Sequence, residues 1–184
     1  ANFSYKIQDG ASGIAHALFL AEDFVGNDRF ALILGDNIFI ESFKDETNKF
    51  TGGAKIFLKE VHDPERFGVA EIAGDKVLSL EEKPVKPKSS FAVTGLYFYD
   101  KHAFEIIKKM EPSQRGELEI TDLNQEYVKR GEMHARVLRT PWFDAGTHEA
   151  LLEAALGIQE LDPEARVKSE AKHGGKVVIG IVLY

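Results

Sequence analysis

Cysteine is absent from this 184-residue sequence. Its absence excludes disulfide bonds, catalysis by a thiolate and zinc sites with cysteine ligands, and it fits a cytoplasmic location. Long apolar runs are missing too, since no stretch approaches the ~20 residues that a membrane-spanning helix needs. No secretory signal pattern opens the sequence. We therefore expect a cytoplasmic protein without a membrane partner.

An excess of positive charge is also lacking, because the formal net charge is -7. Proteins that hold nucleic acids through phosphate contacts need many lysines and arginines, so a nucleic-acid partner is not expected. Nucleotides stay open as ligands, because a metal ion can bridge their phosphates to protein carboxylates.

The residues that are present have the composition of a globular protein, with 43% hydrophobic and 29% charged residues. This length is enough for one compact domain with a sizeable core. Apolar residues recur at strand or helix spacing along most of the chain. The predicted strands cover 3–7, 30–34, 55–59, 67–72, 76–82, 91–99 and 135–138, and the predicted helices lie near 14–24, 104–107 and 119–129 and after Thr147. Strands mixed with helices indicate the α/β class.

Two of these elements also carry a prediction about burial. The alternation in 3–7 predicts a half-buried strand whose apolar side chains share one face. In the helix after Thr147, we expect Leu151, Leu152 and Ala155 to face the core.

The apolar stretch Phe30–Leu34 is followed directly by Gly35 and Asp36. A run of this kind predicts a buried strand that stops at a loop. In open α/β sheets, ligands bind outside the carboxyl ends of the strands. Asp36 is therefore a candidate oxygen ligand for Mg²⁺. The alternative is an ordinary turn residue, because aspartate is common in turns.

Six stretches of the sequence together resemble the sugar nucleotidyltransferase family, and most closely its glucose-1-phosphate thymidylyltransferase branch. They follow the family's order: Gln8–Ala15, Leu34–Phe39, Arg66–Val69, Leu80–Pro84, Arg115–Asp122 and Trp142–Thr147. The resemblance implies a Rossmann-like nucleotidyltransferase fold with a mixed sheet in residues 1–160. Residues 161–184 match nothing in the family and are expected to form an atypical tail.

The resemblance implies a transfer between two phosphates, in which glucose 1-phosphate attacks the α-phosphorus of dTTP. Pyrophosphate leaves and dTDP-glucose remains. Such a reaction needs in-line positioning and a cation that absorbs developing charge. By the same resemblance, Asp36 and Asp144 hold Mg²⁺. For Asp144 alone, a capping role before Thr147 is the alternative.

A further set of residues matches the family's sugar-phosphate site. They are Gly68, Glu82, Lys83, Tyr97, Glu117, Thr121 and Trp142, with Thr94 and Gly95 in a neighbouring matching stretch. The two glutamates are expected to bind sugar hydroxyls, and the lysine is a point charge for the phosphate. Plainer alternatives remain open, namely surface or helix-terminus charge for the charged residues and core packing for the aromatic ones.

The nucleotide base is assigned to Gln8 and Gly13, which match the family's base-binding loop. A glutamine amide offers both a donor and an acceptor to a pyrimidine edge. The glycine would let the base lie close to the backbone. The alternatives are an exposed loop glutamine and a glycine at the start of a helix.

Family members begin with a strand and a glycine-rich loop that contains a catalytic arginine, followed by a lysine. This loop cradles the triphosphate. No stretch of this chain matches that segment, so we expect a member truncated at its N-terminal side, with no catalytic residue placed. One alternative is use of UTP, because a single methyl group is worth only ~1–3 kcal/mol in an apolar pocket. The others are a catalytically incomplete nucleotide-sugar binding module and a homo-oligomer formed through apolar surface.

The last apolar stretch, 176–184, is a strand candidate that the resemblance does not cover. An unpaired strand of this kind would promote aggregation. We therefore predict that it is paired and fills part of a sheet edge.

Overall fold

The computed structural model describes residues 3–161 and 177–181. Its main sheet has seven strands, in the order β3-β7-β5-β4-β6-β1-β9, with an additional pairing between β3 and β6. These strands are β1 (Phe30–Leu34), β3 (Ala54–Glu60), β4 (Gly68–Ala73), β5 (Lys76–Glu82), β6 (Phe91–Tyr99), β7 (Met133–Val137) and β9 (Val177–Ile181). The sheet is mixed, because β1 pairs antiparallel with β6 and parallel with β9.

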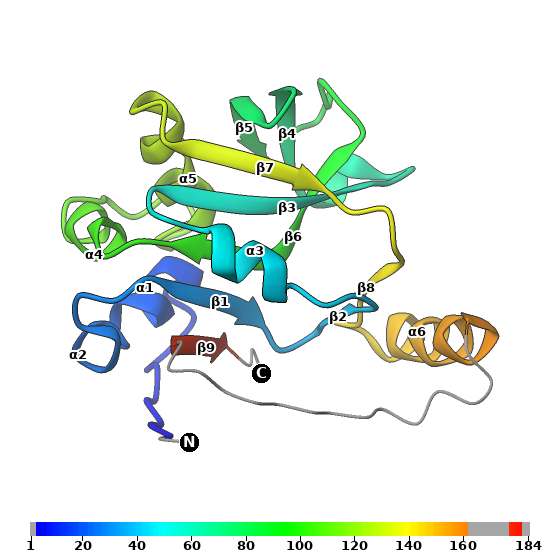
Figure 1. Ribbon diagram of the computed structural model, residues 1–184, viewed down its shortest axis with the longest axis horizontal. Coiled ribbons are helices and arrows are strands. Elements are labelled where there is room, and N and C mark those ends of the chain that lie inside the picture. Colours follow the sequence, from blue (N-terminus) through cyan, green and yellow to red (C-terminus); the bar gives the residue numbers. More distant parts are fainter. Residues whose placement is uncertain (1–2, 162–176, 182–184) are drawn as a thin grey trace.

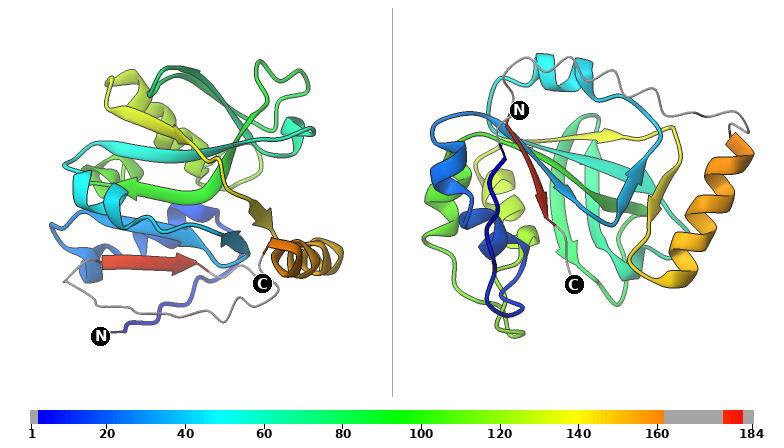
Figure 2. Two further views of the ribbon diagram at one scale, coloured as in Figure 1. Left: turned by 45° about the vertical axis from the view of Figure 1, so that its right-hand side comes forward. Right: turned by 90° about the horizontal axis from the view of Figure 1, so that it is seen from below.

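Helices cover both faces of the main sheet. The helices are α1 (Ile14–Phe19), α2 (Glu22–Val25), α3 (Lys44–Lys49), α4 (His102–Ile107), α5 (Ile120–Lys129) and α6 (His148–Leu161), with a 3₁₀ turn, η1, at Pro64–Arg66. Figure 1 and the view from below in Figure 2 place α1, α4 and α5 on one face and α3 on the opposite face. A second sheet consists of the short strands β2 (Asn37–Phe39) and β8 (Trp142–Asp144).

The strand β6 is apolar on both sides because two cores flank it. Tyr97 and Tyr99 belong to the larger core, which also contains the buried side chains of α1, α4 and α5. Leu96 and Phe98 belong to a smaller core on the other face, with Phe57 of β3. A strand buried on both faces has a continuous apolar sequence instead of an alternating one. Each fully buried side chain of this size stabilises the fold by ~1.5–3 kcal/mol.

The prediction that the terminal strand is paired is confirmed for the described part, Val177–Ile181. The strand β9 pairs in parallel with β1, with Leu32 opposite Ile179. It lies next to β1 at one end of the sheet (Figure 1). Its backbone groups therefore have hydrogen-bonding partners on the β1 side.

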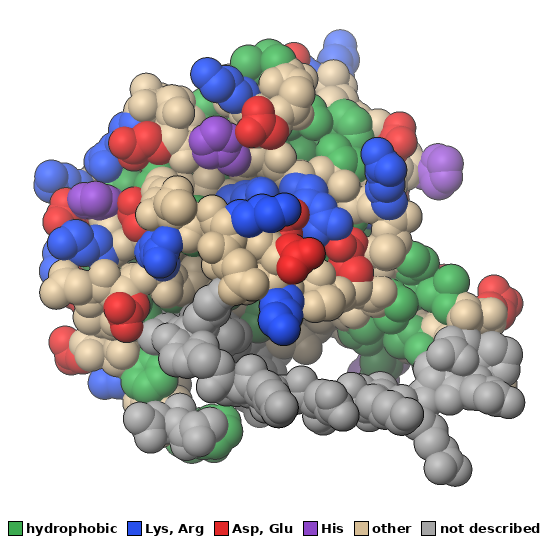
Figure 3. Space-filling view, viewed as in Figure 1, with side chains coloured by type: hydrophobic (Ala, Val, Ile, Leu, Met, Phe, Trp, Pro, Cys, Tyr) green, Lys and Arg blue, Asp and Glu red, His purple; other side chains and the backbone are tan. Residues whose placement is uncertain are grey.

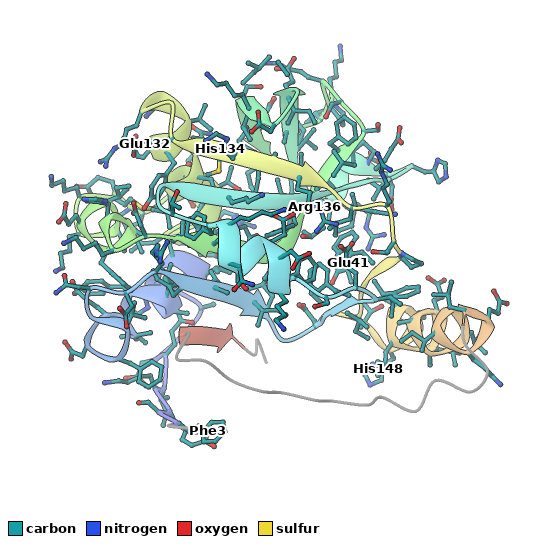
Figure 4. All side chains as sticks on the ribbon, viewed as in Figure 1. Phe3, Glu41, Glu132, His134, Arg136 and His148 are labelled. Carbon is teal, nitrogen blue, oxygen red and sulfur yellow. The ribbon has the colours of Figure 1, made fainter. Side chains whose placement is uncertain are left out.

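The predicted strand at residues 3–7 is wrong. This segment forms no strand, and the side chains of Phe3, Tyr5 and Ile7 are 79%, 90% and 87% exposed. Figure 4 shows Phe3 pointing away from the rest of the molecule. Alternation alone does not make a strand, because the backbone also needs a neighbouring strand, and no described strand pairs with this segment.

The predicted inward face of the last helix is also wrong. Leu151 and Leu152 of α6 are 53% and 62% exposed, and Ala155 is exposed as well, whereas Ala154 is fully buried. A Cβ on Gly157 would lie 2.8 Å from a ring atom of Phe143 in β8. The helix thus approaches β8 closely through small residues, and this contact turns the leucines outward.

The other predicted elements are present with boundaries that differ by a few residues. The predicted helix near 14–24 is two short helices, α1 and α2, and the predicted strands 67–72 and 76–82 form the antiparallel pair β4 and β5. The strands β2 and β8 were not predicted. Among the described residues, no helix is both long enough and apolar enough to span a membrane.

Candidate functional site

The two short strands β2 and β8 bring the predicted metal ligands together. They pair antiparallel with Asn37 opposite Asp144, and the backbone N–H of Ala145 donates to the carbonyl oxygen of Asp36 at 2.7 Å. Around Gly146 the two carboxylates converge, since a Cβ built there would lie 3.3 Å from Oδ2 of Asp36 and 3.4 Å from Oδ1 of Asp144. Two aspartates that are 108 residues apart in the sequence thus face one point.

The electrostatics of this point favour a cation. Burial and the nearby charge of Asp36 raise the pKa of the Asp144 carboxyl above its ordinary value. The N–H of Gly146 and the charges of Arg66 and Lys83 act on this pKa in the opposite direction. Two close carboxylates repel each other, and a divalent cation between them removes this repulsion. The described residues hold no cluster of three or more acidic, histidine or cysteine ligands, so such a cation would take its remaining ligands from water or phosphate.

Asn37 connects this carboxylate pair to the main sheet. Its Nδ2 donates to Oδ1 of Asp36 at 2.8 Å. Its Oδ1 accepts hydrogen bonds from the backbone N–H of Gly95 at 2.8 Å and from Nε1 of Trp142 at 2.7 Å. The sequence alone predicts no function for Asn37, although this residue directly follows Asp36 in a matching stretch. The indole of Trp142 therefore has a polar partner in addition to its edge contact with the ring of Phe67.

A second anchor for the β2–β8 pair comes from Glu41, which follows β2. Arg136 of β7 donates to Oε2 of Glu41 at 2.5 Å, and the hydroxyl of Thr140, just before β8, donates to Oε1 at 2.5 Å. Figure 4 shows Glu41 and Arg136 next to each other, and Figure 3 shows basic and acidic side chains lying together on this face. Both ends of the short sheet are thereby attached to the main sheet.

Three of the predicted sugar-site residues form a second cluster. The hydroxyl of Thr121, in the first turn of α5, donates to Oε2 of Glu82 at 2.5 Å. Gly68 pairs with Glu82 across the β4–β5 hairpin. A Cβ on Gly68 would lie 3.4 Å from Oε2 of Glu82 and 3.5 Å from Oγ1 of Thr121. The glycine thus leaves room beside a carboxylate whose orientation the threonine fixes.

The hydroxyl of Tyr97 is affected by the charges of both Glu82, in the second cluster, and Asp36, in the aspartate pair. Its side chain is buried, and burial together with the charges of Glu82 and Asp36 raises the pKa of its hydroxyl. Both carboxylates therefore favour the neutral form of the same hydroxyl. The buried side chain agrees with the alternative of core packing for this residue. Thr94, on the same strand, is also buried and donates to the carbonyl oxygen of Phe57 at 2.8 Å.

Lys83 and Glu117 lie on the loops next to these clusters. Lys83 has a positive φ of 43°, which is uncommon for a residue other than glycine, and its N–H donates to the carbonyl oxygen of Phe67 at 3.0 Å. The charge of Lys83 acts on Asp144, as described above. Glu117 accepts a hydrogen bond from Arg115 at 3.4 Å, so this carboxylate already has a basic neighbour.

The predicted base-binding loop is attached to the loop that carries Glu117. The N–H of Leu118 donates to the carbonyl oxygen of Ser12 at 2.9 Å, and the N–H of Ala15 donates to that of Leu118 at 3.1 Å. Gly13 has a φ of 92°, and a Cβ there would lie 2.3 Å from the carbonyl oxygen of Leu118. Glycine is therefore required at this position, both because of the positive φ and because a side chain would clash with the backbone of Leu118. Gln8 donates from Nε2 to the carbonyl oxygen of Gly13 at 3.0 Å.

Comparisons with known proteins agree with the sequence resemblance. Residues 1–160 match the sequence profile of the nucleotidyl transferase family. The chain is 47% identical over 165 residues to a glucose-1-phosphate thymidylyltransferase of Neisseria meningitidis, which covers 86% of this chain and 57% of the relative. A Mycobacterium tuberculosis relative of the same name is 42% identical over 174 residues, which covers 91% of this chain and 60% of the relative. The chain thus spans less than two thirds of the length of these relatives.

Solved structures show the same fold. A Bacillus anthracis structure, provisionally named a glucose-1-phosphate thymidylyltransferase and solved with sucrose, matches with a TM-score of 0.77 and 54% identity. The match covers 84% of this chain and 64% of that one. A UDP-glucose pyrophosphorylase in complex with UDP-glucose matches with a TM-score of 0.76 and 26% identity, over 86% of this chain and 66% of that one.

Proposed function

Because the chain belongs to the nucleotidyl transferase family, we propose that it transfers a thymidylyl group from dTTP to glucose 1-phosphate. A phosphate oxygen of glucose 1-phosphate forms a bond to the α-phosphorus of dTTP, the bond from that phosphorus to the β-phosphate oxygen breaks, and pyrophosphate leaves. The observation that carries the proposal is the convergence of Asp36 and Asp144 at Gly146.

The two aspartates would hold Mg²⁺, because paired carboxylate oxygens are a suitable donor set for this hard cation. When bound, Mg²⁺ would supply the positive charge that offsets the charge developing on the phosphoryl oxygens. Asn37 holds the carboxylate of Asp36 in one orientation, so this ligand does not have to be ordered when the cation binds. Lys83 would contribute a positive charge for the phosphate of the sugar.

The sugar would bind at Glu82, with Gly68 leaving space for the ring and Thr121 orienting the carboxylate. Carboxylate oxygens accept hydrogen bonds from sugar hydroxyls, and an acceptor that is already oriented loses less entropy on binding. Glu117 would provide a second acceptor, and Tyr97 and Trp142 would form walls of the site. Gln8 and Gly13 would bind the base of the nucleotide.

Two alternatives remain as proposals of lower rank. UTP can replace dTTP if no residue of the site contacts the methyl group of thymine, and one relative of known structure binds UDP-glucose. The second alternative is a catalytically incomplete nucleotide-sugar binding module, which would keep Gln8, Glu82 and Glu117 for binding. The arginine and lysine that the family resemblance implies match no stretch of this sequence. Association of two copies through apolar surface is compatible with either alternative.

The decisive experiment measures pyrophosphate release from dTTP and glucose 1-phosphate in the presence of Mg²⁺. The variant Asp36→Asn removes one metal ligand, and Asp28→Asn, at an exposed turn, is the matched control. Release by the wild type and the control, with loss in Asp36→Asn, would support the proposed transfer. No release with retained binding of dTDP-glucose would support the binding module instead. Neither release nor binding would overturn both.

A further inference from the structure

The amide of Gln8 is held by two acceptors at once. Its Nε2 lies 3.0 Å from the carbonyl oxygen of Gly13 and 2.9 Å from Nδ1 of His16. A carbonyl oxygen can only accept hydrogen bonds, so the group that faces Gly13 must be the NH₂ of the amide. This contact identifies the nitrogen of the amide without any assumption about the histidine, and both contacts together stabilise the orientation.

The same contact determines the tautomer of His16. Because the NH₂ group of Gln8 also faces Nδ1, that ring nitrogen must carry the lone pair and the hydrogen must reside on Nε2. Both amide hydrogens of Gln8 are then used. Within the described residues, no hydrogen bond engages the amide oxygen Oε1 of Gln8, which keeps its acceptor capacity.

Both acceptors belong to a rigid part of the fold. His16 lies in α1, and the carbonyl oxygen of Gly13 also accepts the N–H of Ala17 at 3.2 Å. The hydrogen bonds between Leu118 and this loop hold Gly13 from the other side. Rotating the amide of Gln8 by 180° would place Oε1 against the oxygen of Gly13 and the lone pair of His16. The observed orientation is therefore strongly preferred over the rotated one.

We infer that His16 is a positioning residue for base recognition, which makes Gln8 an acceptor for a pyrimidine that carries a hydrogen on N3. The inference rests on the proposed function, in which Gln8 binds the base. Thymine and uracil have an N3–H that can donate to Oε1, whereas N3 of cytosine carries a lone pair that would face it. The site would thus select thymine and uracil nucleotides over cytosine nucleotides, without discriminating by the methyl group.

The test compares the affinities of dTDP, dUDP and dCDP by calorimetry, because these ligands share the same sugar and phosphates. For the wild type we expect the affinities for dTDP and dUDP to agree within a few-fold. The affinity for dCDP should be about 10- to 100-fold lower, because Oε1 of Gln8 would then be left without a hydrogen-bond donor. His16→Phe removes the acceptor and should reduce this discrimination about tenfold. His16→Asn can present Oδ1 near the place of Nδ1 and should restore it.

The outcomes separate this inference from the proposed function. If none of the three nucleotides binds, the proposed base site itself is wrong. If dTDP and dCDP bind the wild type equally, or if His16→Phe keeps the full discrimination, the inference alone is wrong. A measurement on the wild type does not depend on the folding of any variant: the ¹⁵N chemical shifts of His16 should show a hydrogen on Nε2 and none on Nδ1. The opposite tautomer would overturn the inference.

Discussion

The side chain of Asn37 occupies the space that a side chain at Gly95 would need. A Cβ on Gly95 would lie 2.6 Å from Cγ and from Nδ2 of Asn37, and the N–H of Gly95 donates to Oδ1 of Asn37 at 2.8 Å. Glycine on β6 therefore lets the amide of Asn37 approach the sheet and hold Asp36. The backbone of a core strand and the candidate metal site depend on one another.

Substituting Gly95→Ala should disturb this arrangement. The clash forces Asn37 to move, and inserting a methyl group into a packed site typically destabilises a protein by ~1–3 kcal/mol. Denaturant unfolding measures this loss, and Mg²⁺ affinity should fall as well because Asp36 loses its partner. Gly52→Ala is the matched control, since a Cβ there would lie at an ordinary 3.6 Å from Asp100. Equal effects of the two substitutions would contradict the structural relationship.

Replacing Asp144 by asparagine should stabilise the metal-free protein at neutral pH. Burial and the charge of Asp36 raise the pKa of Asp144, so the folded state disfavours the ionised carboxylate. The folded state therefore loses stability as the pH rises from the ordinary pKa through the raised one, and this loss persists at neutral pH. For a partly exposed group, we expect the gain in Asp144→Asn to be below ~1 kcal/mol.

Urea unfolding of Asp144→Asn at pH 7 and at about pH 2.5, well below the ordinary aspartate pKa, with and without Mg²⁺, measures this effect. The gain should disappear at the acidic pH, where both the folded and the unfolded wild type carry a protonated Asp144. Added Mg²⁺ should stabilise the wild type but not the variant, because only the wild type has both carboxylates. A variant that is less stable than the wild type at pH 7 without metal would contradict the sign of the argument.

Removing the hydroxyl of Thr121 should weaken sugar binding more than nucleotide binding. In Thr121→Val, Glu82 loses the donor that orients its Oε2, while the shape of the side chain is kept. A hydrogen bond to a charged group is worth ~1.5–3 kcal/mol, so affinity for dTDP-glucose should fall about tenfold or more. Affinity for dTDP, which lacks the sugar, should stay unchanged. Thr47→Val is the control, because this half-buried threonine of α3 donates its hydroxyl to the carbonyl oxygen of Lys44. Equal losses for both ligands would argue against a sugar site at Glu82.

The rates of amide hydrogen exchange should differ between the two ends of the described chain. In β9, amides that bond to β1 should exchange slowly, because they open only when the sheet edge opens. Residues 3–7 belong to no strand and are mostly exposed, so their amides should exchange rapidly in the same experiment. Rapid exchange throughout Val177–Ile181 would mean that β9 does not pair with β1 in solution.

The sequence by itself determined the elements whose signals are local. The apolar run of β1, the turn residues of the β4–β5 hairpin and the helical spacing in α5 each predict one element, since side-chain periodicity follows directly from backbone geometry. The six matching stretches also determined the family, and they predicted residues for the candidate site. Their order and identity along the chain were enough for that assignment.

Tertiary structure decided which of these elements find partners. Three-residue strands such as β2 and β8 carry no periodic signal, and their pairing, which joins Asp36 to Asp144, depends on residues far apart in the chain. The alternation in 3–7 failed because no described strand pairs with this segment. Likewise, α6 turned its leucines outward because Gly157 packs against Phe143. The contact of Gln8 with His16 has the same origin, since hydrogen-bond partners and burial are set by neighbours that only the folded chain brings together.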